Sequence, residues 1–286
     1  MTSQPFYGRR AHLQWDVDCL RSQREGRSRP FPLSPRALTR MYPTRALRYW
    51  FVHNLLRIEQ QRLGRPLSVC EVGIHTGEML RFLRSLEEVA VPIAGWSSWL
   101  GVDQRIDAGG LAGLGYTALA EENIERSDAW LSADPDVVIL LHVLEHLYDP
   151  EDVVRKIGSR MRPGSVLIGG FPSVPAWAAK LREPRIRAHP NHNGHVSVFS
   201  PARLRRMAET SGLELDFMTG AFFLRADGSF LEDRLWWLQF NVAFGARVLN
   251  WPGELYWVMR KPADGSPHPQ GPASTRGVGS ASTRGE

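Results

Sequence analysis

Short apolar runs alternate with stretches of helical spacing along most of the chain, from residue 66 to residue 260. This alternation is typical of a mainly parallel sheet with covering helices. The apolar runs predict strands at 67–72, 98–103, 115–120, 136–141, 165–171, 213–219 and 254–260. The helical stretches predict helices at 77–88, 144–161 and 201–211. The pattern therefore predicts an α/β fold with one central sheet.

The remaining segments divide the chain into three parts. Residues 1–43 form an arm rich in Arg and Pro, residues 44–261 form the folded domain, and residues 262–286 form a tail rich in Pro, Gly and Ser that we expect to be disordered. Within the domain, 44–64 has the apolar spacing of a leading helix, and 230–251 predicts an aromatic helical insertion before the last strand.

The net charge of +5 is concentrated near the N-terminus. Residues 1–50 hold ten Arg against two Asp and one Glu, which is +7, so the rest of the chain sums to −2. A nucleic-acid enzyme usually carries its basic residues along the groove where the chemistry occurs. We therefore do not expect a nucleic-acid substrate, although an RNA contact through the arm stays open as an alternative.

The two cysteines, Cys19 and Cys70, are far apart and belong to no recognisable pattern. This argues against a disulfide framework or a cysteine zinc site and favours a reducing, cytoplasmic location. No apolar run approaches the about twenty residues of a spanning helix, and no signal peptide is evident. Weak association with a membrane surface, through the aromatic insertion, is left open.

The first predicted strand ends in a turn that carries Gly73 and Gly77 and leads directly into a helix. Such a turn lets a ligand approach backbone N–H groups at a helix N-terminus. The Gly-x-x-x-Gly spacing differs from the dinucleotide fingerprint, which argues against a nicotinamide or flavin cofactor. Asp103 ends the second strand, where a carboxylate can accept both hydroxyls of a ribose. Glu121, Glu122 and Asn123 follow the third strand.

The fourth strand continues into the stretch Asp136 to Pro150, which reads Asp-Val-Val-Ile-Leu-Leu-His-Val-Leu-Glu-His-Leu-Tyr-Asp-Pro. With the features above, this stretch resembles the class I S-adenosylmethionine-dependent methyltransferases, especially the bacterial small-molecule group. The resemblance covers about residues 66 to 260. It implies a Rossmann-like, seven-stranded, mainly parallel sheet with an antiparallel last strand, helices on both faces, and S-adenosylmethionine across the carboxyl ends of the strands.

The resemblance also implies a role for each matching position. The implied cofactor-binding residues are Glu71, Gly73, His75 and Gly77 around the methionine part, Asp103 at the ribose, Glu122 or Asn123 near the adenine, and Leu141 and His142 beneath the methionine and the sulfonium. His75 stands where the family usually carries a central glycine, so either the cofactor shifts or the imidazole contacts it. Asp107 is a reserve candidate for the ribose.

Methyl transfer is an in-line displacement in which positioning dominates, and an oxygen acceptor must also lose its proton. Histidine suits that task at neutral pH. We predict that His146 or His195 acts as the general base or orients the acceptor, a small molecule such as a sugar or a secondary metabolite. His142, Glu145 and His146 share a helix face, so a divalent cation is a possible addition, although we assign no metal ligand.

Other functions remain as alternatives. A non-enzymatic S-adenosylmethionine-binding or scaffold protein would account for His75, and an RNA methyltransferase would account for the basic arm. The aromatic insertion packs on the sheet, covers an apolar acceptor, or contacts lipid or a second subunit. The sequence predicts no oligomeric state.

Overall fold

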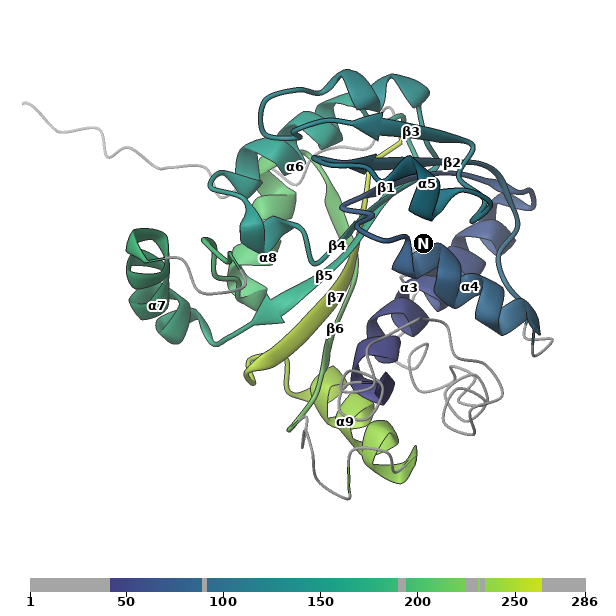
Figure 1. Cartoon of the computed structure of the whole chain (residues 1–286). Coiled ribbons are helices and arrows are strands. Elements are labelled where there is room, and N and C mark those ends of the chain that lie inside the picture. The colour runs from purple at the N-terminus through teal and green to yellow at the C-terminus, as the bar shows by residue number, and fades with distance from the viewer. Residues whose placement is uncertain (1–41, 89–91, 190–193, 225–230, 232–234, 264–286) are drawn as a thin grey trace, which may run out of the picture.

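The computed structural model describes residues 42–88, 92–189, 194–224, 231 and 235–263. A central sheet carries helices on both faces (Figure 1). The predicted N-terminal arm lies almost entirely outside the described residues, and so does the predicted tail.

The described residues form a seven-stranded sheet in the order β3-β2-β1-β4-β5-β7-β6. Its strands are β1 (Leu67–Val72), β2 (Trp96–Asp103), β3 (Ala118–Glu121), β4 (Val137–Leu141), β5 (Val166–Ser173), β6 (Glu214–Ala221) and β7 (Gly253–Arg260). The pairs among β1 to β5 are parallel, whereas β7 runs antiparallel to both β5 and β6. The predicted fold is confirmed.

The described helices are α3 (Tyr42–Leu63), α4 (Glu78–Glu88), α5 (Ala108–Leu111), α6 (Pro150–Arg160), α7 (Ala176–Ala188), α8 (Pro201–Thr210) and α9 (Leu235–Arg247). Two 3-10 turns, η2 (Ala129–Ala133) and η3 (Leu144–His146), complete the set. The apolar pattern did not predict α7, whose helical hydrophobic face is weak and which contains Pro184.

Two sequence predictions of element bounds were wrong. The single helix predicted at 144–161 is divided into η3 and α6, because the residue before Pro150 is disfavoured in a helical conformation. That residue, Asp149, instead caps α6 by accepting a hydrogen bond from the Asp152 N–H at 3.0 Å. The third strand begins at Ala118 rather than at residue 115, where Gly115 has a φ of +109°.

Each face of the sheet has its own hydrophobic core. Helices α3 and α4 cover one face, where Trp50, Phe51 and Phe82 are fully buried. Helices α6 and α8 cover the other face, where Val154 and Leu204 are fully buried. The leading helix is thus an integral part of the core, as its apolar spacing predicted.

The carboxyl ends of β1 to β6 share one edge of the sheet, and β7 begins at this edge because it runs in the opposite direction. Helix α9, within the predicted aromatic insertion, packs here against β6 so closely that a Cβ on Gly220 would lie 2.6 Å from the Gly245 carbonyl oxygen. Trp236 and Phe240 of α9 are nevertheless 57% and 44% exposed. Within the described ranges, we find no helix that combines the length and the apolarity needed to cross a membrane.

Candidate functional site

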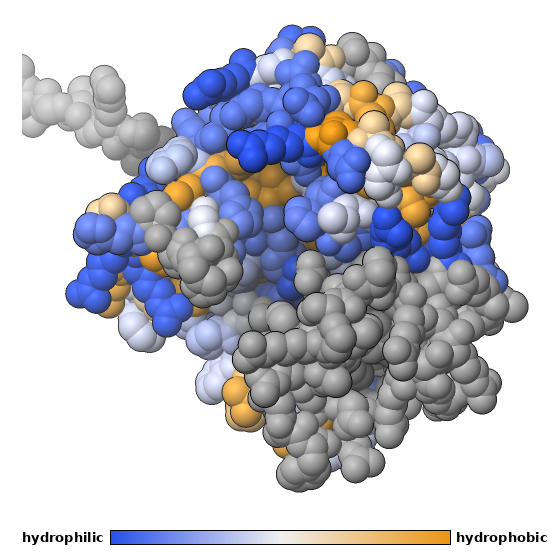
Figure 2. All heavy atoms as spheres, viewed as in Figure 1, coloured by the Kyte–Doolittle hydropathy of each residue, from blue (hydrophilic) through white to orange (hydrophobic). Residues whose placement is uncertain are grey.

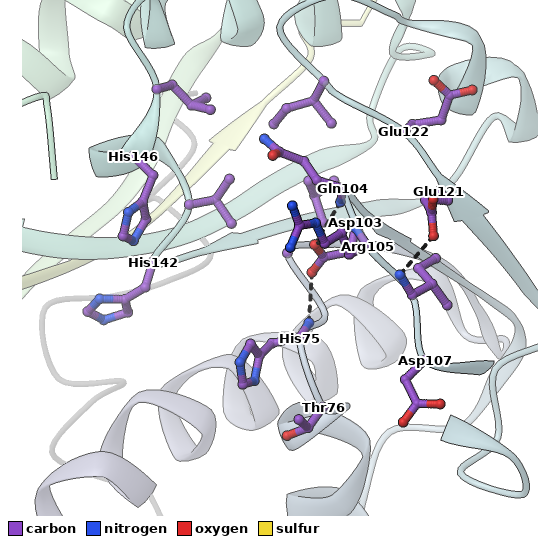
Figure 3. A pocket seen from close by; sticks show the side chains of 16 residues that line it. His75, Thr76, Asp103, Gln104, Arg105, Asp107, Glu121, Glu122, His142 and His146 are labelled. Carbon is purple, nitrogen blue, oxygen red and sulfur yellow. Dashed lines mark hydrogen bonds between the residues drawn. The ribbon is translucent and has the colours of Figure 1, made fainter. Parts of the chain in front are cut away.

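A cavity of about 830 Å³ opens at the carboxyl ends of β1, β2, β3 and β4. Figure 2 shows this hollow as an apolar strip between hydrophilic rims. Acidic side chains line one side of the cavity, among them Asp103, Glu121 and Glu122, and His142 and His146 lie across from them (Figure 3). The polar lining thus has two chemically different sides.

The turn after β1 is held in a left-handed backbone conformation at alternate positions. Gly73, His75 and Gly77 have φ values of +77°, +47° and +76°. A Cβ on Gly73 would lie 2.5 Å from Cγ2 of Val143, so this position requires glycine for space as well as for conformation. His75 adopts the backbone conformation that glycine favours, and its exposed ring lies 3.1 Å from Oε1 of Glu78.

The ends of β2 and β3 present carboxylates that backbone N–H groups hold in place. Oδ2 of Asp103 accepts from the His75 N–H at 2.8 Å, and Oδ1 accepts from the Gln104 N–H at 2.7 Å (Figure 3). Oε2 of Glu121 accepts from the Ile106 N–H at 3.0 Å. Each carboxylate oxygen can accept two hydrogen bonds, so both groups keep acceptor capacity toward the cavity.

Asp107, the reserve candidate, also lines the cavity, but its side chain caps α5 by accepting from the Gly110 N–H at 3.1 Å. Sequence reasoning did not select Thr76, Gln104 or Arg105, although they line the cavity as well. Gln104 and Arg105 directly follow β2, and Thr76 lies in the turn after β1. These positions at the carboxyl ends of strands are a signal that could have identified them.

Glu71 lies behind the cavity wall. Its Oε2 accepts from Nε1 of Trp99 at 3.0 Å and from the hydroxyl of Tyr116 at 3.2 Å, and the side chain is buried. Burial without a cationic partner raises the pKa of Glu71 to about 8. Of the predicted cofactor residues, the cavity lining includes Gly73, His75, Asp103, Glu122 and His142, and it does not include Glu71, Gly77, Asn123 or Leu141.

His142 lies in a buried group of charged side chains. Its Nδ1 is 3.0 Å from Oε1 of Glu145, and its Nε2 is 3.6 Å from Oε2 of Glu254. Nη2 of Arg48 contacts the other oxygen of Glu254 at 3.2 Å, and the Tyr256 hydroxyl donates to the same carboxylate. Burial and Arg48 oppose a charged imidazole, but Glu254 and Glu145 outweigh them and raise the pKa of His142.

Arg48 and Glu254 were not predicted as site residues. They lie 206 positions apart in α3 and β7, and neither belongs to a local motif. Only the sheet order brings β7 next to β5 and so carries Glu254 to the cavity edge.

The two histidines predicted to act on the acceptor lie against each other, but His146 lines the cavity and His195 does not. The rings of His146 and His195 are 4.8 Å apart between centroids and nearly perpendicular, at 78°. Nδ1 of His146 lies 3.3 Å from the carbonyl oxygen of Gly194. His195 belongs to a histidine-dense segment, 189–195, that also contains His189 and His192. His189 follows the end of α7, and His192 lies outside the described residues.

A comparison of the sequence with models of known families identifies the family of this chain. A sequence model described as a methyltransferase domain matches residues 42–216, which is more than half of the chain. The chain belongs to this methyltransferase family. It is a class I S-adenosylmethionine-dependent methyltransferase, so the resemblance stated from the strand-end motifs is confirmed. The matched segment contains every cavity-lining residue.

Solved structures of methyltransferases are similar to this chain at low sequence identity. The CMeT domain of the citrinin polyketide synthase is 14% identical with a TM-score of 0.50, over 80% of this chain and 58% of that domain's chain. The plantazolicin methyltransferase BamL, in complex with a triazolic desmethylPZN analog and S-adenosylhomocysteine, is 13% identical with a TM-score of 0.48. The match covers 88% of this chain and 96% of the BamL chain.

The N-methyltransferase NodS from Bradyrhizobium japonicum, in complex with S-adenosylhomocysteine, is 15% identical with a TM-score of 0.44, over 74% of this chain and 86% of its own. A search of curated proteins gave no match.

Proposed function

We propose that this methyltransferase transfers a methyl group to an oxygen atom of a small molecule. The observation that carries the proposal is the placement of His142 and His146 across the cavity from Asp103 and Glu121 (Figure 3). Carboxylates suit the hydroxyls of a cofactor ribose, and imidazoles suit an acceptor that must lose a proton. The cavity thus has room and chemistry for two ligands.

The cofactor half lies along the ends of β1 to β3. S-adenosylmethionine supplies the methyl group there. The methionine part follows the turn at Gly73 and His75, where the absence of a side chain on Gly73 allows close approach. Asp103 accepts hydrogen bonds from the ribose hydroxyls.

The outer parts of the cofactor site follow from the same placement. Glu122 lies near the adenine and His142 lies beneath the sulfonium, whereas Asn123 and Leu141 do not line the cavity and are not proposed to touch the ligand. Glu71 and Gly77 support the turn from behind rather than touch the ligand, since neither lines the cavity.

The acceptor half lies at His146 and His195. Either imidazole can take the proton of a hydroxyl that enters from the open side of the cavity. Apolar side chains, among them Ile124 and Leu147, line the cavity between the two halves. A partly apolar cavity of about 830 Å³ favours a small molecule, such as a sugar or a secondary metabolite. The two-cysteine composition supports a cytoplasmic location, which stays a prediction.

Cofactor binding is tested by calorimetric titration of the full chain with S-adenosylhomocysteine. We expect Asp103→Ala to bind about 10- to 100-fold more weakly, because hydrogen bonds to a charged group contribute about 1.5–3 kcal/mol. Asp107→Ala is the matched control, since Asp107 lines the same cavity but caps α5. Equal losses in both variants would contradict the role of Asp103.

Acceptor chemistry is tested with S-adenosylmethionine carrying a ¹³C methyl group and a panel of phenols, sugars and hydroxylated polyketides. The carbon chemical shift of the product distinguishes methyl groups on oxygen, nitrogen and carbon. Products methylated only on nitrogen or carbon would contradict the proposal. Full turnover by His146→Ala and by His195→Ala, with unchanged S-adenosylhomocysteine binding, would remove both histidines from the mechanism.

The basic arm 1–43 supports RNA as a second class of acceptor, because its eight Arg could neutralise phosphates. Methylation of RNA that falls steeply with salt and is lost when residues 1–41 are deleted would favour this alternative. Activity on small molecules that survives the deletion would favour the first proposal.

A further inference from the structure

Glu145 and His146 in η3 lie beside His195, which is 49 positions later in the chain. The backbones of the two segments are joined by hydrogen bonds. The N–H groups of Val196 and Ser197 donate to the Glu145 carbonyl oxygen at 2.9 and 3.1 Å. The three side chains are thus positioned by a rigid connection and not by a chance approach of surface loops.

The three side chains offer a converging set of donor atoms. One nitrogen of each imidazole and one carboxylate oxygen of Glu145 all lie within 4.8 Å of one another. Donors around a single zinc ion are about 3.4 Å apart, given tetrahedral bonds of about 2.1 Å. His146 is exposed and His195 is half-buried, so small rotations of their rings can shorten the distances between donor atoms from up to 4.8 Å toward this value.

At His146 and Glu145, the hydrogen bonds leave one ligand atom available on each side chain. The Gly194 carbonyl can only accept, so Nδ1 of His146 carries the proton and Nε2 keeps its lone pair for a ligand. Oε1 of Glu145 accepts from Nδ1 of His142 at 3.0 Å. The residue is only 2% exposed, and its Oε2 is buried and has no hydrogen-bond partner within the described ranges.

An unpartnered oxygen of a buried carboxylate is costly, since such groups are normally satisfied. A cation at the centre of the cluster would satisfy it. Two imidazole nitrogens and one carboxylate oxygen suit a first-row divalent transition ion, whereas calcium and magnesium favour oxygen ligands throughout. These observations together distinguish the cluster from an ordinary group of polar side chains.

We propose that Glu145, His146 and His195 bind a divalent transition-metal ion such as Zn²⁺. His142 is a positioning residue that orients the Glu145 carboxylate and does not itself bind the ion. His146 lines the cavity, so the remaining coordination positions face the acceptor half.

The role of the ion in catalysis rests on the proposed methyl transfer to oxygen, whereas the binding of the ion does not. An ion at this position lowers the pKa of the acceptor hydroxyl. The hydroxyl proton passes to water, and the new bond from oxygen to the methyl carbon forms as the bond from that carbon to sulfur breaks. The two histidines then serve this step as ligands instead of as bases.

The experiment uses the full chain without an affinity tag, freed of metal by chelation and dialysis. Co²⁺ serves as the spectroscopic probe, because its visible absorption reports coordination by nitrogen and oxygen ligands. We expect one Co²⁺ per chain, displaced by Zn²⁺ in a competition titration. His146→Ala and His195→Ala should each weaken binding at least about 100-fold, and His142→Ala about 10- to 100-fold.

His189→Ala is the matched control, because His189 is an exposed histidine of the same histidine-dense segment that ends α7. This variant should bind Co²⁺ as the unaltered chain does. No saturable binding of Co²⁺ or Zn²⁺, or equal binding by a variant that carries both His146→Ala and His195→Ala, would overturn the proposal.

S-adenosylhomocysteine binding is measured on every variant. Retained binding shows that a variant is folded, so a loss of Co²⁺ then reports the ligand itself. Metal binding without O-methylation would refute the proposed function and leave the metal site standing. O-methylation that is unaffected by removal of the metal would refute the catalytic role of the ion alone.

Discussion

Two buried glutamates, one beneath each half of the cavity, have opposite electrostatic surroundings. Glu71, beneath the cofactor half, accepts hydrogen bonds from the neutral side chains of Trp99 and Tyr116. Glu254, beneath the acceptor half, contacts the Arg48 guanidinium and lies near His142. Burial disfavours a charged carboxylate in both places, but among the residues that the structure describes, Glu254 has cationic partners and Glu71 has none.

The two halves of the cavity differ in which parts of the chain supply their polar groups. The cofactor half uses partly exposed carboxylates and backbone N–H groups from the turns after neighbouring strands, as between His75 and Asp103, which are 28 positions apart. The acceptor half relies on a charged group that α3, β7, β4 and η3 assemble together. We therefore expect the stability of the fold to tolerate loss of charge in the first half and to depend on charge in the second half.

The largest effect should come from removing Glu254. Glu254→Ala leaves the largely buried Arg48 without its partner, so the free energy of unfolding should fall by about 3–5 kcal/mol. Urea denaturation measures the change. Glu214→Ala, at an exposed position of β6, should stay within about 0.5 kcal/mol. A loss below 1 kcal/mol for Glu254→Ala would show that the charged group does not stabilise the fold.

The free energy of unfolding should depend on pH because Glu71 titrates differently in the folded and unfolded chain. Its pKa in the folded chain is about 8, above the about 4.3 of an unfolded chain. Between these values the folded state holds a proton that the unfolded state has lost, so stability falls as the pH rises. From pH 6 to pH 8 the loss should be about 2 kcal/mol.

The matched variant for this prediction is Glu71→Gln, which keeps an oxygen acceptor for Trp99 and Tyr116. Its free energy of unfolding should decrease less over the same range and should exceed that of the unaltered chain at pH 8. Parallel pH profiles for the two proteins would mean that Glu71 titrates normally.

Gly73→Ala should cost less stability but should specifically impair the cofactor half. The left-handed backbone adds about 1–2 kcal/mol of strain, and the new methyl group meets Val143 at the cavity wall. We expect S-adenosylhomocysteine binding to weaken at least about tenfold. Gly164 has a similar φ of +82°, and a Cβ there would lie in open space. Gly164→Ala should therefore lose stability but keep its affinity for S-adenosylhomocysteine. Equal affinities of the Gly73→Ala and Gly164→Ala variants for S-adenosylhomocysteine would exclude close approach of a ligand at Gly73.

The smallest effect should come from His75→Gly. Relief of the left-handed strain and the greater entropy of unfolded glycine oppose one another, so stability should change by less than about 1 kcal/mol. S-adenosylhomocysteine affinity should stay within about threefold, since the backbone N–H that reaches Asp103 is kept. A loss of tenfold or more would show that the imidazole itself contacts the cofactor.

Much of the cofactor half could be predicted because its residues follow strand ends. β1 begins and ends where the apolar pattern placed it, and Asp103 ends β2 as predicted. Positions that directly follow parallel strands must meet at one edge of the sheet. Local sequence therefore carried the information for Gly73, Asp103 and Glu122.

The sequence by itself determined the alternation of strands and helices and the family, because both depend on short-range patterns. Only the tertiary structure decided the acceptor half. It joined Arg48 to Glu254 across 206 positions and placed His195 against His146. The periodicity of the sequence does not predict these long-range contacts, because they depend on the strand order and on the antiparallel direction of β7. Long-range packing of the whole sheet selects both.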